Sequence, residues 1–353
     1  MKDEKIYESM NSKKKIRLNG NESFKNIDKY KVCEIIEEIS KENFNRYPDS
    51  ENITLRKAYG KYCNVNYKNI IAGNGSDEMI SLVISSNINK GDKVLTLNPD
   101  FSMYDYYVSL NEGELIKLNS RNDGSYSIND FIDIGKREEV KLIIFSNPNN
   151  PTGFSLCNDD IKKILDNFKN TLVLVDEAYF EYNSSTIIDE VKNYNNLLVT
   201  RTLSKAFSGA AIRVGFLIGS EELINKLNRL KVPYNVNSIS QIIGAKIIDD
   251  VDSMRISVDE TVTERERMIK LLKGLEEEWS GYIEFYRSNA NYIFGRSMYK
   301  EMFLKHLDEN DIEIRNFKDD SFRITIGSAK ENNLVLKVIK EFCNERSCYK
   351  ERD

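Results

Sequence analysis

The chain has 353 residues, a length that suits a two-domain enzyme better than one simple core. Apolar residues make up 40% and charged residues 30%, and the formal net charge of −5 argues against a surface for nucleic acid. No apolar run approaches the roughly 18 residues of a membrane span, and five scattered cysteines without metal-ligand spacing indicate a reducing cytoplasm and no metal site.

The first segment, residues 1–44, is expected to form an N-terminal arm and part of a small domain. Residues 45–245 are predicted to form a large domain, because short apolar runs alternate there with helical patterns. This alternation is typical of βαβ units and a mostly parallel sheet. The predicted strands are residues 93–97, 141–145, 171–175, 196–200 and 214–218. Helical apolar faces lie within residues 79–84 and 160–169.

The pattern changes after residue 245, and residues 246–353 are predicted to form a smaller α+β domain. A long charged helix is expected over residues 259–279, and two further helices follow it. The predicted strands are residues 282–286, 291–294, 312–315 and 322–326. The single histidine, His306, falls on an amphipathic helix as a surface or packing residue, which disfavours catalysis by a histidine base.

Polar motifs follow three of the predicted strands, at the edge where an open parallel sheet binds its ligands. Residues 146–153 (SNPNNPTG) follow one strand and residues 176–179 (DEAY) follow the next. Residues 201–205 (RTLSK) follow a third strand, and Arg213 comes eight residues later. Three polar motifs at three strand ends indicate one shared ligand site.

These motifs, in this order and spacing, resemble those of the class I/II (fold-type I) aminotransferases, most of all the histidinol-phosphate aminotransferase branch. The specificity is carried by residues 73–78 (GNGSDE), 147–153, 176–179 and 204–207 (SKAF), and the resemblance extends from residue 19 to about residue 327. It implies an α/β fold with a central, mostly parallel sheet flanked by helices, a smaller α+β domain, and pyridoxal 5′-phosphate as the cofactor.

The resemblance implies that Lys205 carries the cofactor as a Schiff base. A lysine amine attacks an aldehyde only when it is neutral, and an ordinary pKa of about 10.4 leaves almost none neutral at pH 7. Burial at a strand end beside cations such as Arg213 would lower that pKa. Once the substrate amine displaces it, the freed lysine can move the substrate proton, so no histidine is needed.

Asp176 ends an apolar strand, where a lone carboxylate would be costly, and a protonated ring nitrogen of the cofactor would compensate it. The resemblance implies that Tyr179 and Asn150 share the 3′-oxygen of the cofactor and that Phe101 stacks on its ring. At position 100 this chain has aspartate where the family usually has threonine.

The turn at residues 73–78 precedes an apolar helix, and glycines before a helix N-terminus present free N–H groups to a phosphate. Gly75, Ser76 and Asp77 are therefore expected to hold the cofactor phosphate through their backbone amides. Ser204 and Arg213 are expected to supply a hydroxyl group and a bidentate cation for the same phosphate.

Four more residues receive roles through the resemblance. Tyr47, in residues 45–49 (NRYPD), would reach the cofactor phosphate of a neighbouring subunit, which implies a homodimer. Arg323 and Arg315 lie on predicted strands, where burial is costly without an anion, and would bind the acidic group of the substrate. Asn21 is expected to line the mouth of the substrate site.

The predicted activity is transfer of an amino group from an L-amino-acid-like donor to 2-oxoglutarate through a pyridoxamine intermediate, with histidinol phosphate as the favoured donor in histidine biosynthesis. A threonine-phosphate decarboxylase is the closest alternative, because sequence does not fix which bond at the α-carbon breaks. An aromatic or other amino-acid aminotransferase also remains open, since the N-terminal arm is short and has Tyr7 where the family has a Pro-Tyr segment. A non-enzymatic regulator that binds the cofactor is disfavoured by the acidic charge and the lack of a DNA-binding domain.

Overall fold

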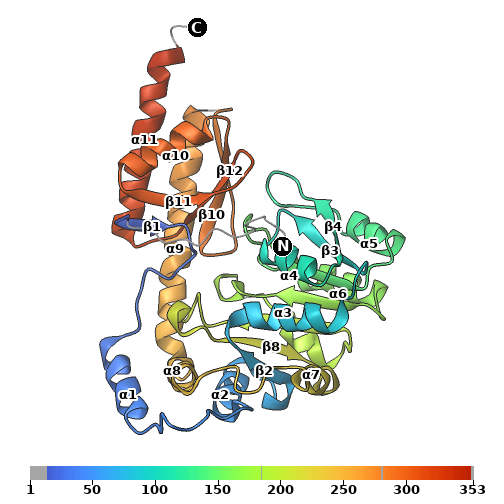
Figure 1. Ribbon diagram of the computed structural model, residues 1–353. Helices are drawn as coiled ribbons and strands as arrows, with labels where there is room; N and C mark the ends of the chain where they lie inside the picture. Colours follow the sequence, from blue (N-terminus) through green and yellow to red (C-terminus); the bar gives the residue numbers. More distant parts are fainter. Residues whose placement is uncertain (1–13, 184, 280, 351–353) are drawn as a thin grey trace.

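The computed structural model describes residues 14–183, 185–279 and 281–350. Figure 1 shows two lobes, and the smaller one carries the C-terminal helix. The larger lobe is built on a seven-stranded sheet in the order β2-β8-β7-β6-β5-β3-β4. Its strands are β2 (Ile70–Gly73), β3 (Lys93–Asn98), β4 (Glu114–Asn119), β5 (Leu142–Ser146), β6 (Leu172–Asp176), β7 (Leu197–Thr202) and β8 (Gly215–Gly219). β8 runs antiparallel to β2 and β7, and the remaining pairs are parallel, which confirms the predicted sheet.

Helices cover both faces of this sheet, so its strands β5 and β8 are buried along their whole length. One face packs against α3 (Gly75–Asn87), α4 (Met103–Leu110) and α7 (Glu221–Asn228). The other packs against α2 (Ile53–Cys63), α5 (Ile128–Arg137), α6 (Asn158–Asn167) and α8 (Ser238–Ile248). The predicted apolar face of α6 is confirmed, because Ile161, Ile164 and Leu165 are fully buried. The first helix, α1 (Lys29–Ile39), contacts α8.

The smaller lobe has a five-stranded sheet in the order β1-β11-β12-β10-β9. Its strands are β1 (Ile16–Leu18), β9 (Ile283–Tyr286), β10 (Tyr292–Ser297), β11 (Ile312–Asn316) and β12 (Ser321–Thr325). Its helices are α9 (Val251–Glu278), α10 (Lys300–Glu309) and α11 (Ala329–Lys350). β1 pairs in parallel with β11, so the N-terminal segment belongs to this sheet and then crosses to the larger lobe.

Several elements differ from the sequence-based expectation. β2 and β4 are not predicted, because β2 has four residues and β4 is an edge strand that lacks a buried apolar run. α9 begins before the predicted residue 259, since its first turns already bury Met254 and Val258. Short 3-10 helices, η1 (Tyr67–Asn69), η2 (Phe180–Tyr182), η3 (Ile188–Lys192) and η4 (Ala210–Ile212), link the longer elements.

The described part of the chain lacks the features of two other kinds of site. None of its helices is both long and apolar enough to cross a membrane. No group of three or more histidine, cysteine, aspartate or glutamate side chains there could hold a metal ion.

Candidate active site

The polar residues at the carboxyl ends of β5, β6 and β7 lie side by side, as the sheet register requires. Ser146 pairs with Asp176 across β5 and β6, and Asp176 pairs with Thr200 across β6 and β7. Lys205 follows β7 by three residues. The segment from Asn19 to Asn21, just after β1, reaches this edge from the smaller lobe, because the Lys205 amine donates to the Gly20 carbonyl at 3.0 Å.

Lys205 has the environment that a neutral amine needs. Burial and the nearby Arg323 guanidinium lower its pKa to about 8, with a further contribution from Arg213, against the opposing charges of Glu22 and Asp77. Its Nζ lies 5.7 Å from the centre of the Tyr179 ring. A much larger fraction of this lysine is therefore neutral near pH 7 than of an exposed one.

Asp176 is 4% exposed and is held by two hydroxyl groups. Tyr104 Oη donates to Oδ2 at 3.0 Å, and Thr200 Oγ1 donates to Oδ1 at 3.1 Å. Burial raises the pKa of Asp176 to about 6 although both hydroxyl groups favour its charged form. Neither hydroxyl group has a role among the predicted site residues, yet the position of Thr200 directly before the RTLSK motif is a sequence signal for one of them.

Tyr179 and Asn21 are joined across 158 residues of chain. The Asn21 side-chain amide donates to Tyr179 Oη at 2.9 Å. Asn21 itself is 1% exposed and has a φ of 52°, and Thr325 and Asn291 hold its backbone and side chain in that conformation. The fixed left-handed backbone aims the amide at the tyrosine.

Arg323 is 5% exposed and connects the two lobes. Its guanidinium group donates to the Asn150 side-chain oxygen and, at 2.8 Å, to the Asn19 carbonyl. It also lies 5.0 Å from the centre of the Tyr292 ring. Arg315 stands opposite Arg323 in the antiparallel β11–β12 pair, so the two side chains share a face of the sheet, but Arg315 is only partly buried.

A compact cradle forms where β2 meets α3. Arg213 donates to Ser204 Oγ at 3.3 Å and to Asp77 Oδ2 at 3.3 Å. Gly75 has a φ of 82°, and a Cβ atom there would lie 2.7 Å from Arg213 Nη2. A Cβ atom on Gly215 would lie 2.2 Å from the Ser76 nitrogen, so glycines allow the backbone to pack this closely. The Asp77 carboxylate pairs with Arg213, in addition to the amide role that the sequence predicts.

Phe101 and Tyr47, two of the aromatic residues in the predicted site, differ in placement. Phe101 is partly buried and packs edge-on against Tyr104 with ring centres 5.6 Å apart, beside Asp176. Tyr47 is 81% exposed and stacks on Tyr234 at 4.8 Å, outside the cluster around Lys205. Tyr7, the proposed substitute for the Pro-Tyr segment, lies outside the described residues.

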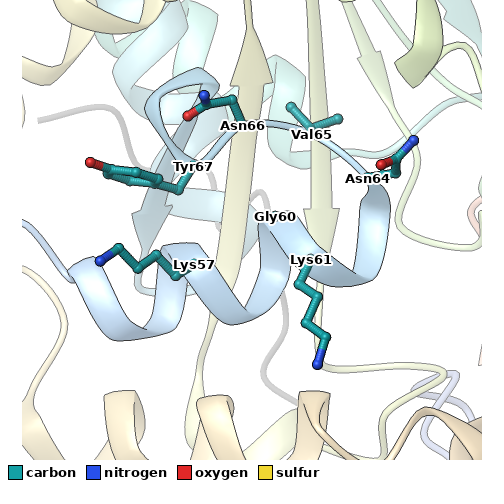
Figure 2. A pocket seen from close by; sticks show the side chains of 7 residues that line it. All are labelled: Lys57, Gly60, Lys61, Asn64, Val65, Asn66 and Tyr67. Carbon is teal, nitrogen blue, oxygen red and sulfur yellow. The ribbon is translucent and has the colours of Figure 1, made fainter.

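A separate surface pocket of about 410 Å³ lies between the C-terminal half of α2 and η1 (Figure 2). Its lining includes Lys57, Lys61, Asn64, Asn66 and Tyr67. None of the predicted site residues lines it, so the candidate active site is the cluster at the strand ends.

The family model for "Aminotransferase class I and II" matches residues 13–339. The histidinol-phosphate aminotransferase of Clostridium novyi (strain NT) is 40% identical over 349 residues, which cover 96% of this chain and 95% of that protein.

Two solved structures have the same architecture. The histidinol-phosphate aminotransferase from Clostridium acetobutylicum aligns with a TM-score of 0.84 and 26% identity over 94% of this chain and 99% of that one. The histidinol-phosphate aminotransferase from Sinorhizobium meliloti, solved in complex with pyridoxal-5′-phosphate, aligns with a TM-score of 0.85 and 18% identity over 94% of this chain and 91% of that one. At 18% identity, the second match supports only the shared fold.

Proposed function

The chain belongs to the class I and II aminotransferases, and on this basis we propose that it transfers the amino group of L-histidinol phosphate to 2-oxoglutarate in histidine biosynthesis, with pyridoxal 5′-phosphate as cofactor. The observation that carries the proposal is the Lys205 amine at the strand ends, whose pKa burial and two guanidinium groups lower to about 8. The choice of donor is supported by the near-full-length match to a relative of that name.

The residues present fit the proposed cofactor by charge. At one end, Arg213, Ser204 and the backbone at Gly75 form a cradle with cationic and N–H donors suited to a phosphate. At the other end, the buried Asp176 carboxylate accepts hydrogen bonds from the Tyr104 and Thr200 hydroxyl groups, and a protonated ring nitrogen would neutralise its charge. When bound, the cofactor supplies an electron sink for bond breaking at the α-carbon of the substrate.

The chain's own residues then have separate tasks. Lys205 holds the cofactor and, when released, takes and returns the substrate proton as a general base. Asp176 orients the ring nitrogen and balances its charge. Tyr179, fixed by Asn21, would donate toward the oxygen substituent of the ring, and Phe101 would stack on the ring face.

Arg323 and Arg315 are proposed to bind the acidic ends of both substrates. Histidinol phosphate carries a phosphate group and 2-oxoglutarate carries a second carboxylate, and guanidinium groups bind either anion in a bidentate manner. Because both arginines share one sheet face, one anion site can serve the two half-reactions in turn.

We further propose a cytoplasmic homodimer in which Tyr47 contacts the cofactor phosphate of the partner subunit. An exposed, stacked pair of aromatic rings, Tyr47 and Tyr234, is the kind of surface that a subunit interface covers. Cys33, Cys63, Cys157 and Cys343 are free thiols, as expected in a reducing compartment.

The function is tested by a half-reaction without any keto acid. The cofactor-loaded protein is mixed with histidinol phosphate, with threonine phosphate, and with an aromatic amino acid, while cofactor absorbance and released carbon dioxide are recorded. We expect histidinol phosphate alone to discharge the visible absorbance rapidly, and 2-oxoglutarate to restore it with formation of glutamate. Carbon dioxide from threonine phosphate would identify a decarboxylase instead, and the Lys205→Ala variant sets the background.

A further inference from the structure

Residues 19–21 follow β1 and connect the sheet of the smaller lobe with the candidate active site. The Asn19 carbonyl accepts a hydrogen bond from the Arg323 guanidinium group at 2.8 Å. The Gly20 carbonyl accepts one from the Lys205 amine at 3.0 Å. The third residue of the segment holds the site tyrosine through its side-chain amide. The position of this short segment therefore affects the anion site and the reactive lysine together.

The segment lies beyond the backbone pairing that fixes β1 to its sheet. The last pair between β1 and β11 joins Leu18 to Ile314, so the residues that follow are held by other contacts. Asn21 is anchored by hydrogen bonds of its backbone and its side chain, as described above. Asn19, which is 5% exposed, has its own anchor, because its side-chain amide donates to the Glu313 carboxylate at 2.6 Å. A hydrogen bond to a charged acceptor is about twice as strong as one between neutral groups, so this anchor is a firm one.

Glu313 stands where its charge works against the binding of anions. It precedes Arg315 by two residues on β11, so the two half-buried side chains project from the same face of the sheet. Arg323 pairs with Arg315 and shares that face. A carboxylate beside an anion site repels the anion, so the charge of Glu313 alone gives no benefit to substrate binding. The contact with Asn19 does give one, because the carbonyl of the same residue holds the Arg323 guanidinium group.

We propose that Glu313 is a positioning residue of the anion site, which anchors Asn19 so that the Asn19 carbonyl orients Arg323 for the acidic group of the substrate. The guanidinium group has a second acceptor in the Asn150 side chain of the larger lobe. With both acceptors fixed, the plane of the guanidinium group is set before the substrate arrives, and binding does not have to order it. Without the anchor, the Asn19 carbonyl is free to shift, and part of the binding energy is spent on ordering Arg323. The inference rests on the proposed function, in which Arg323 binds the acidic ends of the substrates.

Two substitutions of Glu313 separate anchoring from repulsion. Glu313→Ala removes both the charge and the anchor, whereas Glu313→Gln removes the charge and keeps an oxygen that can accept from the Asn19 amide. Anchoring predicts weaker anion binding in the alanine variant and its rescue in the glutamine variant. Repulsion alone predicts tighter binding in both variants. Glu284→Ala is the matched control, because Glu284 is an exposed strand glutamate on β9, at the other edge of the same sheet.

The first measurement is a calorimetric titration of the cofactor-loaded proteins with glutarate, which has the two carboxylates of 2-oxoglutarate without its keto group. We expect the dissociation constant to rise about tenfold in Glu313→Ala, which corresponds to the loss of one charge-assisted hydrogen bond. Glu313→Gln and Glu284→Ala should stay within about twofold of the wild type, since each keeps an acceptor for Asn19. Binding to Glu313→Ala that is as tight as in the wild type, or equal weakening in the alanine and glutamine variants, would overturn the proposal. A wild-type protein that does not bind glutarate would overturn it as well.

The second measurement asks whether Glu313 acts through Asn19. Asn19→Ala keeps the backbone carbonyl and removes the side-chain amide, so by itself it should weaken glutarate binding about as much as Glu313→Ala. In the double variant, Glu313→Ala should cause no further weakening, because the contact is already lost. Additive losses from the two substitutions would show that Glu313 acts by another route and would refute the proposed role.

Steady-state kinetics separate this role from a general loss of structure and from a failure of the proposed function. Glu313→Ala should raise KM for histidinol phosphate and for 2-oxoglutarate alike and leave kcat nearly unchanged, and Glu313→Gln should restore both KM values. Turnover of histidinol phosphate with the same KM in the wild type and in Glu313→Ala would overturn this inference alone. A wild type that binds glutarate with the expected variant effects but does not react with histidinol phosphate would overturn the proposed donor and leave the role of Glu313 standing.

Discussion

The neutral fraction of Lys205 gives a quantitative prediction for the rate at which the protein without cofactor captures pyridoxal phosphate. A pKa of about 8 leaves about one lysine in ten neutral at pH 7, compared with about one in three thousand for the ordinary value of 10.5. Capture by Lys205 at pH 7 should thus be about 300-fold faster than its intrinsic nucleophilicity would allow at the ordinary pKa. Since only the neutral amine reacts, the rate should rise tenfold per pH unit below pH 7 and level off above about pH 9.

Stopped-flow absorbance of cofactor capture, measured against a small-molecule amine at each pH, separates the lysine titration from that of the cofactor. Lys205→Ala gives the rate of binding without the covalent link. Arg323→Gln removes the largest charge that lowers the Lys205 pKa, so its pH profile should shift toward higher pH. Capture that keeps rising tenfold per unit to pH 10 in the wild type, or a profile that Arg323→Gln leaves in place, would refute the electrostatic account of Lys205.

Arg323→Lys should raise KM for histidinol phosphate at least about tenfold, because lysine cannot replace a buried bidentate contact. Arg315→Lys should raise KM less, because Arg315 is partly exposed. Equal effects of the two variants in steady-state kinetics would contradict the assignment. Tyr47→Phe should speed cofactor loss during dialysis without changing the sedimentation coefficient of the dimer, with Tyr30→Phe, another exposed tyrosine, as the control; normal retention would count against a shared site. Arg201→Met should lower the free energy of unfolding by about 3–5 kcal/mol in urea titrations, because it leaves the buried Glu177 carboxylate without its cation. Adding Glu177→Leu should recover much of that loss in stability. No recovery in the double variant would argue against a charge effect.

The sequence predicts the centre of the site well because each of its motifs follows a strand. Asp176 ends the apolar strand β6, and Lys205 follows the end of β7 by three residues. Parallel strands bring their carboxyl ends to one edge without further information. The family resemblance assigns roles to Asp176 and Lys205. Their proximity already follows from the pattern of apolar residues that marks the strands and from the lengths of those strands. Local pattern and sheet geometry are therefore sufficient for this part.

The contacts that reach the site from the smaller lobe could not be predicted in the same way. The hydrogen bond between Asn21 and Tyr179 spans 158 residues and depends on how the N-terminal segment crosses between lobes. Arg323 and Arg315 occupy similar strand positions in the sequence, yet only Arg323 is buried, because it contacts Asn19 and Asn150. Which of the two strand arginines is buried depends on tertiary packing, which leaves no periodic signal in the local sequence.

The reversed strand β8 explains how a loop can hold a reactive lysine in place. Thr202 and Gly215 are paired across β7 and β8, so the segment that carries Ser204, Lys205 and Arg213 is closed at both ends by the sheet. Within it, Thr202 Oγ1 accepts from the Ser204 backbone N–H at 3.1 Å. A parallel β8 would have to begin at the opposite edge of the sheet, and the return segment would leave the ligand edge. The antiparallel pairing thus keeps Lys205 and the proposed phosphate ligands Ser204 and Arg213 on one loop that the sheet anchors at both ends. On this loop the charge of Arg213 can act on the Lys205 amine and on the phosphate.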